Sequence, residues 1–216
     1  MFYSKFRKII FIVFAILLLA QFSACAEEKT PAGATEERGE TPSEQPNNLS
    51  GEVIINLNYE SQSGWASNQF AVWVEDINGG YIKTLYATIW TADGGYTTRP
   101  ESILLWVEKA NPELMPKQEL DAVAGATPKS GSLAYTWDMT NQNGEIVPHG
   151  EYKIFVEGSL RWRNRVIFSG VINTGGGAQE ITAEPEFIYE SSSNGEALDG
   201  SAPENSMISA VTIKIN

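Results

Sequence analysis

Cys25 is the only cysteine in this chain of 216 residues, and the sequence before it indicates the fate of its thiol. Three basic residues among the first eight positions precede an unbroken apolar run over residues 9–20. That run is too short to cross a bilayer, and two small residues, Ser23 and Ala24, stand directly before Cys25. This arrangement is typical of a secretory signal with its cleavage site. We therefore expect a cleaved signal peptide over residues 1–24.

The residues Phe22-Ser23-Ala24-Cys25 resemble the lipobox of bacterial lipoproteins. The resemblance implies that Cys25 is diacylated, becomes the first residue of the mature protein and anchors the chain to an envelope membrane. An acylated cysteine leaves no free thiol, so disulfides and thiol catalysis would both be excluded. The alternative is an ordinary signal peptide followed by a chance cysteine.

A second group of residues that could carry chemistry lies in the segment 121–130, which reads DAVAGATPKS. Thr127 offers a hydroxyl, and Gly125 and Ala126 before it are small. The segment resembles the Asp-x-x-Ser/Thr/Ala-Gly-Ala-Thr signature of proteins that carry FMN covalently. The resemblance implies that a flavin transferase joins FMN by a phosphoester to an exposed Thr127 hydroxyl on a flexible segment, with Asp121 as the matching acidic position. The alternative is a structural loop in which Asp121 caps a turn and Gly125 supplies an unusual φ.

Other residues that could do chemistry are sparse. His149, the only histidine, stands between Pro148 and Gly150, which is typical of an exposed turn residue. One histidine without a free thiol excludes an ordinary zinc site and a Ser-His-Asp triad. Carboxylates are numerous, but the sequence shows no constrained pair of the kind that glycosidases use. We therefore expect no catalytic residue, no metal and no required cofactor.

The charge of the chain limits its partners. The formal net charge is −12 at pH 7, and the expected signal peptide contains basic residues but no acidic ones. An acidic surface of this kind argues against binding nucleic acid or anionic lipid. One basic cluster stands out against it, and its members are Arg161, Trp162, Arg163 and Arg165. This cluster is a candidate patch for an acidic partner or a lipid headgroup, or else a solvated hairpin tip.

The segment 25–50 has a composition unlike the rest of the mature chain. It holds no large apolar residue except Leu49 and is rich in Glu, Thr, Pro and Ser. Such a segment buries too little apolar surface to offset the entropy lost on ordering. We therefore expect a disordered acidic tether that follows the lipidated cysteine.

Residues 51–216 alternate between apolar and polar side chains, which predicts β-strands. The predicted strands are Val53–Tyr59, Phe70–Glu75, Tyr81–Trp90, Leu133–Trp137, Tyr152–Gly158, Arg165–Ile172, Gln179–Glu190 and Ile208–Ile215. One short helix fits residues 100–110 and should stop at Asn111-Pro112. Long polar connections are expected over 111–130 and 191–205. The pattern predicts an all-β domain, a single antiparallel β-sandwich with one short helix.

A motif at the end of one predicted strand favours a particular kind of sandwich. Trp137-Asp138 is followed by a glycine-containing loop and then by Val147-Pro148-His149-Gly150-Glu151-Tyr152. This pattern resembles the Ig-like module of flagellar hook-capping proteins. Trp137 would close the end of the sandwich while Asp138 accepts backbone N–H bonds, and Gly144 and Gly150 would permit positive φ.

Several separated motifs in this order are similar to those of the bacterial periplasmic domain-of-unknown-function family 2271. They are Ala71–Asp76, Gly80–Leu85, the helix with Trp106, Asp121–Thr127 and Trp137-Asp138, and the resemblance covers most of residues 53–175. It implies an Ig-like sandwich in the bacterial envelope and brings no established enzymatic activity.

Two hypotheses for the function follow. In the first, the protein is a non-catalytic envelope lipoprotein, a binding or assembly module for another envelope protein. In the second, it is an accessory or covalent FMN carrier in an extracytoplasmic electron-transfer system, with the flavin on Thr127. Both hypotheses predict that the membrane is contacted through the lipid anchor alone.

Overall fold

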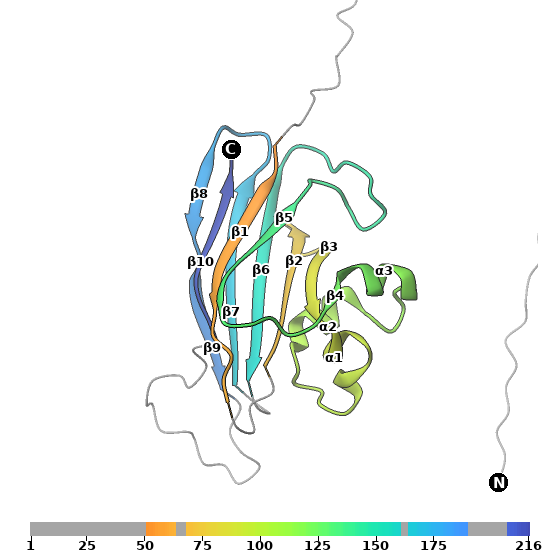
Figure 1. Ribbon diagram of the computed structural model, residues 1–216. Helices are drawn as coiled ribbons and strands as arrows, with labels where there is room; N and C mark the ends of the chain where they lie inside the picture. The colour runs from red at the N-terminus through yellow and green to blue at the C-terminus, as the bar shows by residue number, and fades with distance from the viewer. Residues whose placement is uncertain (1–50, 64–67, 161–163, 190–206) are drawn as a thin grey trace, which may run out of the picture. The chain divides into compact units, whose positions relative to one another are not determined.

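The computed structural model describes residues 51–63, 68–160, 164–189 and 207–216. These residues form two β-sheets packed face to face, with short helices against one of them (Figure 1). The predicted all-β sandwich is thereby confirmed. The predicted signal peptide, Cys25, the tether and the connection 191–205 lie outside the described residues.

The two sheets differ in size and are built mostly from antiparallel strands. The smaller sheet has four strands in the order β5 (Gly131–Trp137), β1 (Val53–Tyr59), β10 (Ile208–Ile215) and β8 (Gln179–Thr182). The larger sheet has six in the order β4 (Ala124–Gly125), β3 (Tyr81–Thr88), β2 (Gln69–Asp76), β6 (Glu151–Leu160), β7 (Asn164–Asn173) and β9 (Glu184–Tyr189). Among the described strands, only the short pairing of β3 with β4 is parallel.

The main core lies between the two sheets. Strand β1 shows why it forms there: Val53, Ile55, Leu57 and Tyr59 are buried, while Asn56 and Asn58 between them face solvent. Successive side chains of a strand point to opposite faces, so this alternation buries one face and hydrates the other. The outer face of the small sheet is therefore polar and open.

Helices cover the outer face of the large sheet and create a second core. They are α1 (Ile89–Ala92), the 3-10 turn η1 (Gly95–Thr97), α2 (Leu104–Ala110) and α3 (Lys117–Val123), and they lie beside β2 and β3 in Figure 1. Ile103, Trp106 and Leu120 pack there against Trp73 and Phe155, whose rings stack with centroids 5.0 Å apart. None of the described helices is both long and apolar enough to span a membrane.

Several predicted boundaries were wrong. The strand predicted over Tyr81–Trp90 ends at Thr88, where α1 begins, and the helix predicted over 100–110 begins only at Leu104. The connection predicted over 111–130 contains α3 and β4, so the described chain has more helix than the one segment expected. The strand predicted over Gln179–Glu190 is two strands, because the chain passes from the small sheet to the large one at the buried Ala183.

The Trp137-Asp138 motif forms as predicted. Trp137 is fully buried, and its Nε1 donates to the Thr140 carbonyl at 2.8 Å. Asp138 accepts the Thr140 backbone N–H at 3.2 Å and pairs with Lys83 at 2.8 Å. Gly144 has the expected positive φ, 79°, but Gly150 does not, so that part of the prediction was wrong.

Candidate functional site

Thr127 lies on the connection that carries the chain from β4 in the large sheet to β5 in the small one (Figure 1). Strand β3 ends at Thr88, the second of its two residues that pair with β4, because the chain turns there into α1. The chain beyond β4 can therefore reach the start of β2, where the Thr127 hydroxyl donates to the Asn68 carbonyl at 3.5 Å. Thr127 is exposed, as an acceptor of a transferred group must be.

The connection is held at both ends. At its start, the Tyr86 hydroxyl donates to the Ala126 carbonyl at 2.9 Å. At its end, the Ser130 hydroxyl accepts the Ser61 backbone N–H at 2.9 Å. The long polar connection expected over 111–130 is therefore shorter than predicted: it spans residues 126–130, and each of its ends accepts a hydrogen bond from another part of the domain.

Gly125 is required here for a reason other than the unusual φ that the structural alternative proposed. Its φ is not positive. A Cβ atom at this position would lie 2.6 Å from Cε2 of the Tyr86 ring, closer than carbon atoms approach in proteins. The absence of a side chain at Gly125 lets Tyr86 reach past it to Ala126.

Tyrosine and phenylalanine rings fill the space beneath this connection. The centroids of Tyr86 and Tyr135 are 5.1 Å apart, and Phe70 lies 4.7 Å from Tyr86 and 6.3 Å from Tyr135. Burial raises the pKa of Tyr86 to about 12 and raises that of Tyr135 as well. Both hydroxyls are therefore protonated at neutral pH, which keeps Tyr86 a hydrogen-bond donor to Ala126.

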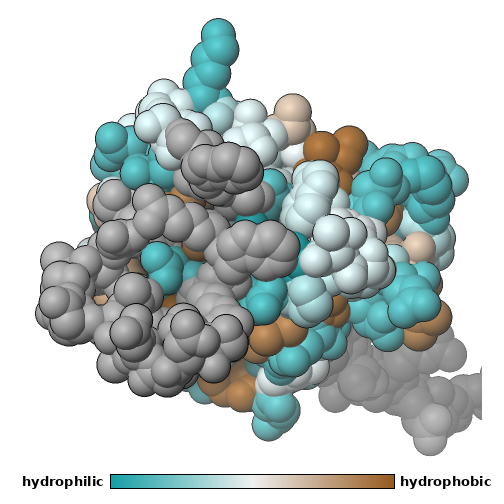
Figure 2. Space-filling model, turned by 90° about the horizontal axis from the view of Figure 1, so that it is seen from below, coloured by the Kyte–Doolittle hydropathy of each residue, from teal (hydrophilic) through white to brown (hydrophobic). Residues whose placement is uncertain are grey.

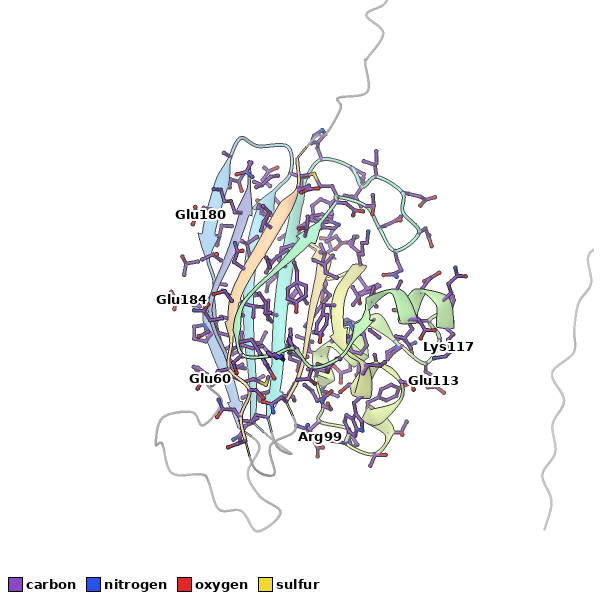
Figure 3. All side chains as sticks on the ribbon, in the orientation of Figure 1. Glu60, Arg99, Glu113, Lys117, Glu180 and Glu184 are labelled. Carbon is purple, nitrogen blue, oxygen red and sulfur yellow. The ribbon has the colours of Figure 1, made fainter. Side chains whose placement is uncertain are left out.

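Asp121 does not cap a turn. It lies in the last turns of α3, is exposed, and accepts a hydrogen bond from Lys117 one turn earlier at 3.1 Å. Lys117 also reaches Asp93 after α1, at 3.3 Å, and these two carboxylates raise the pKa of the Lys117 amine. Figure 3 shows Lys117 on the outer side of the helices. Asp121 thus shares the exposed Lys117 amine with Asp93, and it lies six residues before Thr127.

A buried polar cluster fixes the end of β3 near Thr127. Gln69 Oε1 accepts hydrogen bonds from the hydroxyls of Thr88 at 2.7 Å and Thr91 at 2.9 Å. Thr91 also bonds Ser102 at 2.6 Å. Buried polar groups are stable only when they are paired, so this cluster fixes where α1 leaves the sheet.

Arg165 is the one member of the predicted basic cluster that the structure describes. Arg165 is only 10% exposed in its side chain, and its guanidinium donates to the buried Glu157 at 3.3 Å. Arg165 faces the helices because it follows the alternation of β7 on the covered face of the large sheet. Arg161, Trp162 and Arg163 lie outside the described residues.

Two of the described carboxylates, Glu75 and Glu157, are buried, which the sequence did not predict. Glu75 accepts hydrogen bonds from the Trp73 indole at 2.8 Å and from Lys109 at 2.9 Å. Glu157 accepts the backbone N–H groups of Leu105 and Trp106, at 3.4 and 3.0 Å, at the start of α2. The sequence signal for this burial is a glutamate inside an otherwise apolar strand, as in Phe155-Val156-Glu157. Both groups hold helices to the sheet.

The other candidates for chemistry stay apart from Thr127. His149 is an exposed turn residue, as predicted, with Nδ1 3.0 Å from the Thr174 carbonyl. Within the described ranges, no group of three or more His, Cys, Asp or Glu side chains could hold a metal ion.

These features define a class of protein: a β-sandwich with helices packed on one sheet and an exposed threonine on a hydrogen-bonded connection between the two sheets. Residues 52–190 match the model of the family described as predicted periplasmic protein (DUF2271), and the chain belongs to this family. The family expected from the separated motifs is thereby confirmed, and its description agrees with an envelope location. No curated protein and no solved structure matches the chain.

Proposed function

We propose that this protein is a non-catalytic, lipid-anchored module of the bacterial envelope that carries FMN on Thr127 for extracytoplasmic electron transfer. The observation that supports this most directly is the exposed Thr127 hydroxyl on a segment held by Tyr86 and Ser130. Its only described hydrogen bond, to Asn68, is long at 3.5 Å and leaves the oxygen lone pairs available.

The attachment is a phosphoryl transfer catalysed by another enzyme. The Thr127 oxygen forms a P–O bond to the FMN phosphorus, and the phosphoanhydride bond of a flavin dinucleotide breaks. The hydroxyl proton passes to a base of the transferase, and a nucleoside monophosphate leaves. This chain contributes only the hydroxyl and an accessible backbone, which fits the small residues Gly125 and Ala126.

The topology of β1 supports a carrier that reaches away from its anchor. The chain enters the domain at Gly51, beside Met139 and the C-terminal Asn216. Strand β1 then runs the length of the small sheet to Tyr59, which pairs with Gly131 directly after the Thr127 connection. A tether from Cys25 would therefore join one end of the domain while Thr127 stands at the other, facing redox partners in the envelope space.

Thr127→Ala should abolish covalent flavin. The full chain is co-expressed with a flavin transferase, and the denatured protein is examined for fluorescence after electrophoresis. Wild type and Thr127→Ser should give a fluorescent band, because both offer the hydroxyl, while Thr127→Ala should give none. Thr136→Ala is the matched control, because Thr136 is exposed on β5 and should not affect labelling. An unlabelled wild type beside a labelled known acceptor would contradict the carrier and leave a binding or assembly module.

Cys25→Ser should block lipidation. The wild-type protein should partition into detergent, and its mature mass should correspond to an acylated residue 25, because the tripartite signal ends there. The variant should remain as an uncleaved precursor or appear free of the membrane. An intact mass showing an unmodified mature N-terminus in the wild type would contradict the lipid anchor, whatever the outcome for Thr127.

A further inference from the structure

The connection that bears Thr127 crosses the edge where the two sheets meet. It leaves the large sheet at β4, which pairs with β3 over only Ala87 and Thr88. It enters the small sheet at β5, the edge strand, which pairs with β1. The side chains of β3 and β5 at this edge therefore lie directly beside the Thr127 connection.

Two partly exposed tyrosines meet at this edge. Tyr86 of β3 and Tyr135 of β5 have ring centroids 5.1 Å apart and planes inclined by 39°. Behind them, Phe70 is fully buried and contacts both rings, and Tyr59 packs on Phe70 with centroids 5.4 Å apart. The two outer tyrosines thus rest on a fixed aromatic layer and keep part of their own surface in solvent.

The attachment point is next to this pair. The Tyr86 hydroxyl holds the carbonyl of Ala126, the residue that immediately precedes Thr127. A flavin ring is flat and aromatic, and aromatic pairs gain about 0.5–1.5 kcal/mol beyond the area that they bury. A ring tethered at Thr127 would find its nearest partly exposed tyrosine surface at this edge.

We propose that Tyr86 and Tyr135 form the surface against which the isoalloxazine ring of a Thr127-linked FMN packs. This inference rests on the proposed flavin attachment. Electron-rich tyrosine rings in contact with a flavin quench its fluorescence by electron transfer, so flavin on this protein should be dim. The surface would also restrict the ring between encounters with redox partners.

A competing surface exists on α1, at the same end of the domain. Trp90 is 43% exposed, and Ile89 beside it is also exposed. The Trp90 ring packs against Gly95, where an added Cβ would lie 2.6 Å from ring atom Cδ2, so part of the ring is covered. Seen from below, the hydrophobic surface of the described residues forms separate areas rather than one face (Figure 2).

The test uses the full chain labelled with FMN and measures flavin fluorescence intensity and anisotropy. Tyr86→Phe/Tyr135→Phe keeps both rings but removes their ease of oxidation, so fluorescence should rise several-fold. Tyr135→Leu should also lower the anisotropy, because Tyr135 is partly exposed and its removal frees one side of the ring. Tyr152→Phe is the control, because Tyr152 lies at the opposite end, where its hydroxyl donates to the Pro148 carbonyl.

The outcomes separate this inference from the proposed function. Absence of covalent flavin in the wild type would refute the carrier itself. Covalent flavin whose fluorescence is the same in wild type and in the double variant would overturn the tyrosine surface alone. The same conclusion would follow if Trp90→Leu raised the fluorescence and the tyrosine variants did not. Melting temperatures of the double variant, which preserves the ring packing, show whether the comparison is made on folded protein.

Discussion

Replacing Trp137 with alanine should lower the free energy of unfolding by about 3–5 kcal/mol, as large-to-small core changes do. The indole is fully buried between the sheets, packs edge-on against Tyr152 with centroids 5.0 Å apart, and donates its N–H to Thr140. The variant would leave a cavity in the core and one carbonyl without its donor. The expected loss is a large share of the free energy of unfolding of a domain, which is about 5–15 kcal/mol in total.

Urea and thermal unfolding measure this loss, followed by the circular dichroism of the backbone, which does not depend on the tryptophan that is removed. Trp90→Ala is the matched control, because the Trp90 ring is 43% exposed and its removal leaves no comparable cavity. A Trp137→Ala variant that melted within about two degrees of the wild type would contradict the burial of this ring, since 1 kcal/mol corresponds to about 2–4 °C at this size.

The strands of the small sheet were predictable because one of their faces is solvated. Strand β1 buries every second residue, and β10 does so with one irregularity, so the sequence carries the period of two. Strand β2 is buried on both faces over seven of its eight residues. On the face of β2 that the helices cover, the polar Gln69 and Glu75 are typical of a face in contact with solvent. Only Ala71 and Trp73 on that face indicate the second core.

The helix α3 could not be predicted from the sequence because it buries too few side chains to produce a helical pattern of apolar residues. It has seven residues, of which only Leu120 is buried, and it begins after Pro116 without a side-chain cap. A stable apolar stripe needs residues three and four apart over several turns, and α3 is too short to show one. Its described contacts are the buried Leu120 in the second core and an exposed ion pair between Lys117 and Asp93, a residue distant in sequence.

The exposure of Thr127 was predictable from its small and polar neighbours, but the surroundings of Thr127 were not. Tyr86 lies 40 residues before Ala126, and Ser61 lies 69 residues before Ser130. Such contacts depend on strand order, which a local pattern does not specify. The glycine at 125 was visible in the sequence, and only the position of the Tyr86 ring explains it.

Glu157 has the most demanding environment of the described carboxylates. It is fully buried, and it accepts hydrogen bonds from two backbone N–H groups of α2 and from the guanidinium group of Arg165. Residue Ile103 stands at the N-cap of α2 with a φ of 42° and provides no side-chain cap, so Glu157 on β6 takes over that role from a neighbouring strand. Burial raises the pKa of Glu157, and the hydrogen bonds and the Arg165 charge only partly offset that effect.

Glu157→Ala should therefore cost about 3–5 kcal/mol, because it leaves helix donors unpaired and removes a carboxylate from beside the buried Arg165. Glu180→Ala, on the outer side of β8 in Figure 3, is the control and should change stability by less than about 0.5 kcal/mol.

The raised pKa of Glu157 also predicts the direction in which stability changes with pH. Between the ordinary glutamate value, 4.5, and the raised folded value, the folded state binds more protons than the unfolded state, so this group lowers stability as pH rises through that window. Glu157→Gln lacks the titrating group, so its stability should fall less than that of the wild type over the same pH range. Urea unfolding at a series of pH values measures both slopes, and equal slopes would show that Glu157 titrates normally in the folded protein.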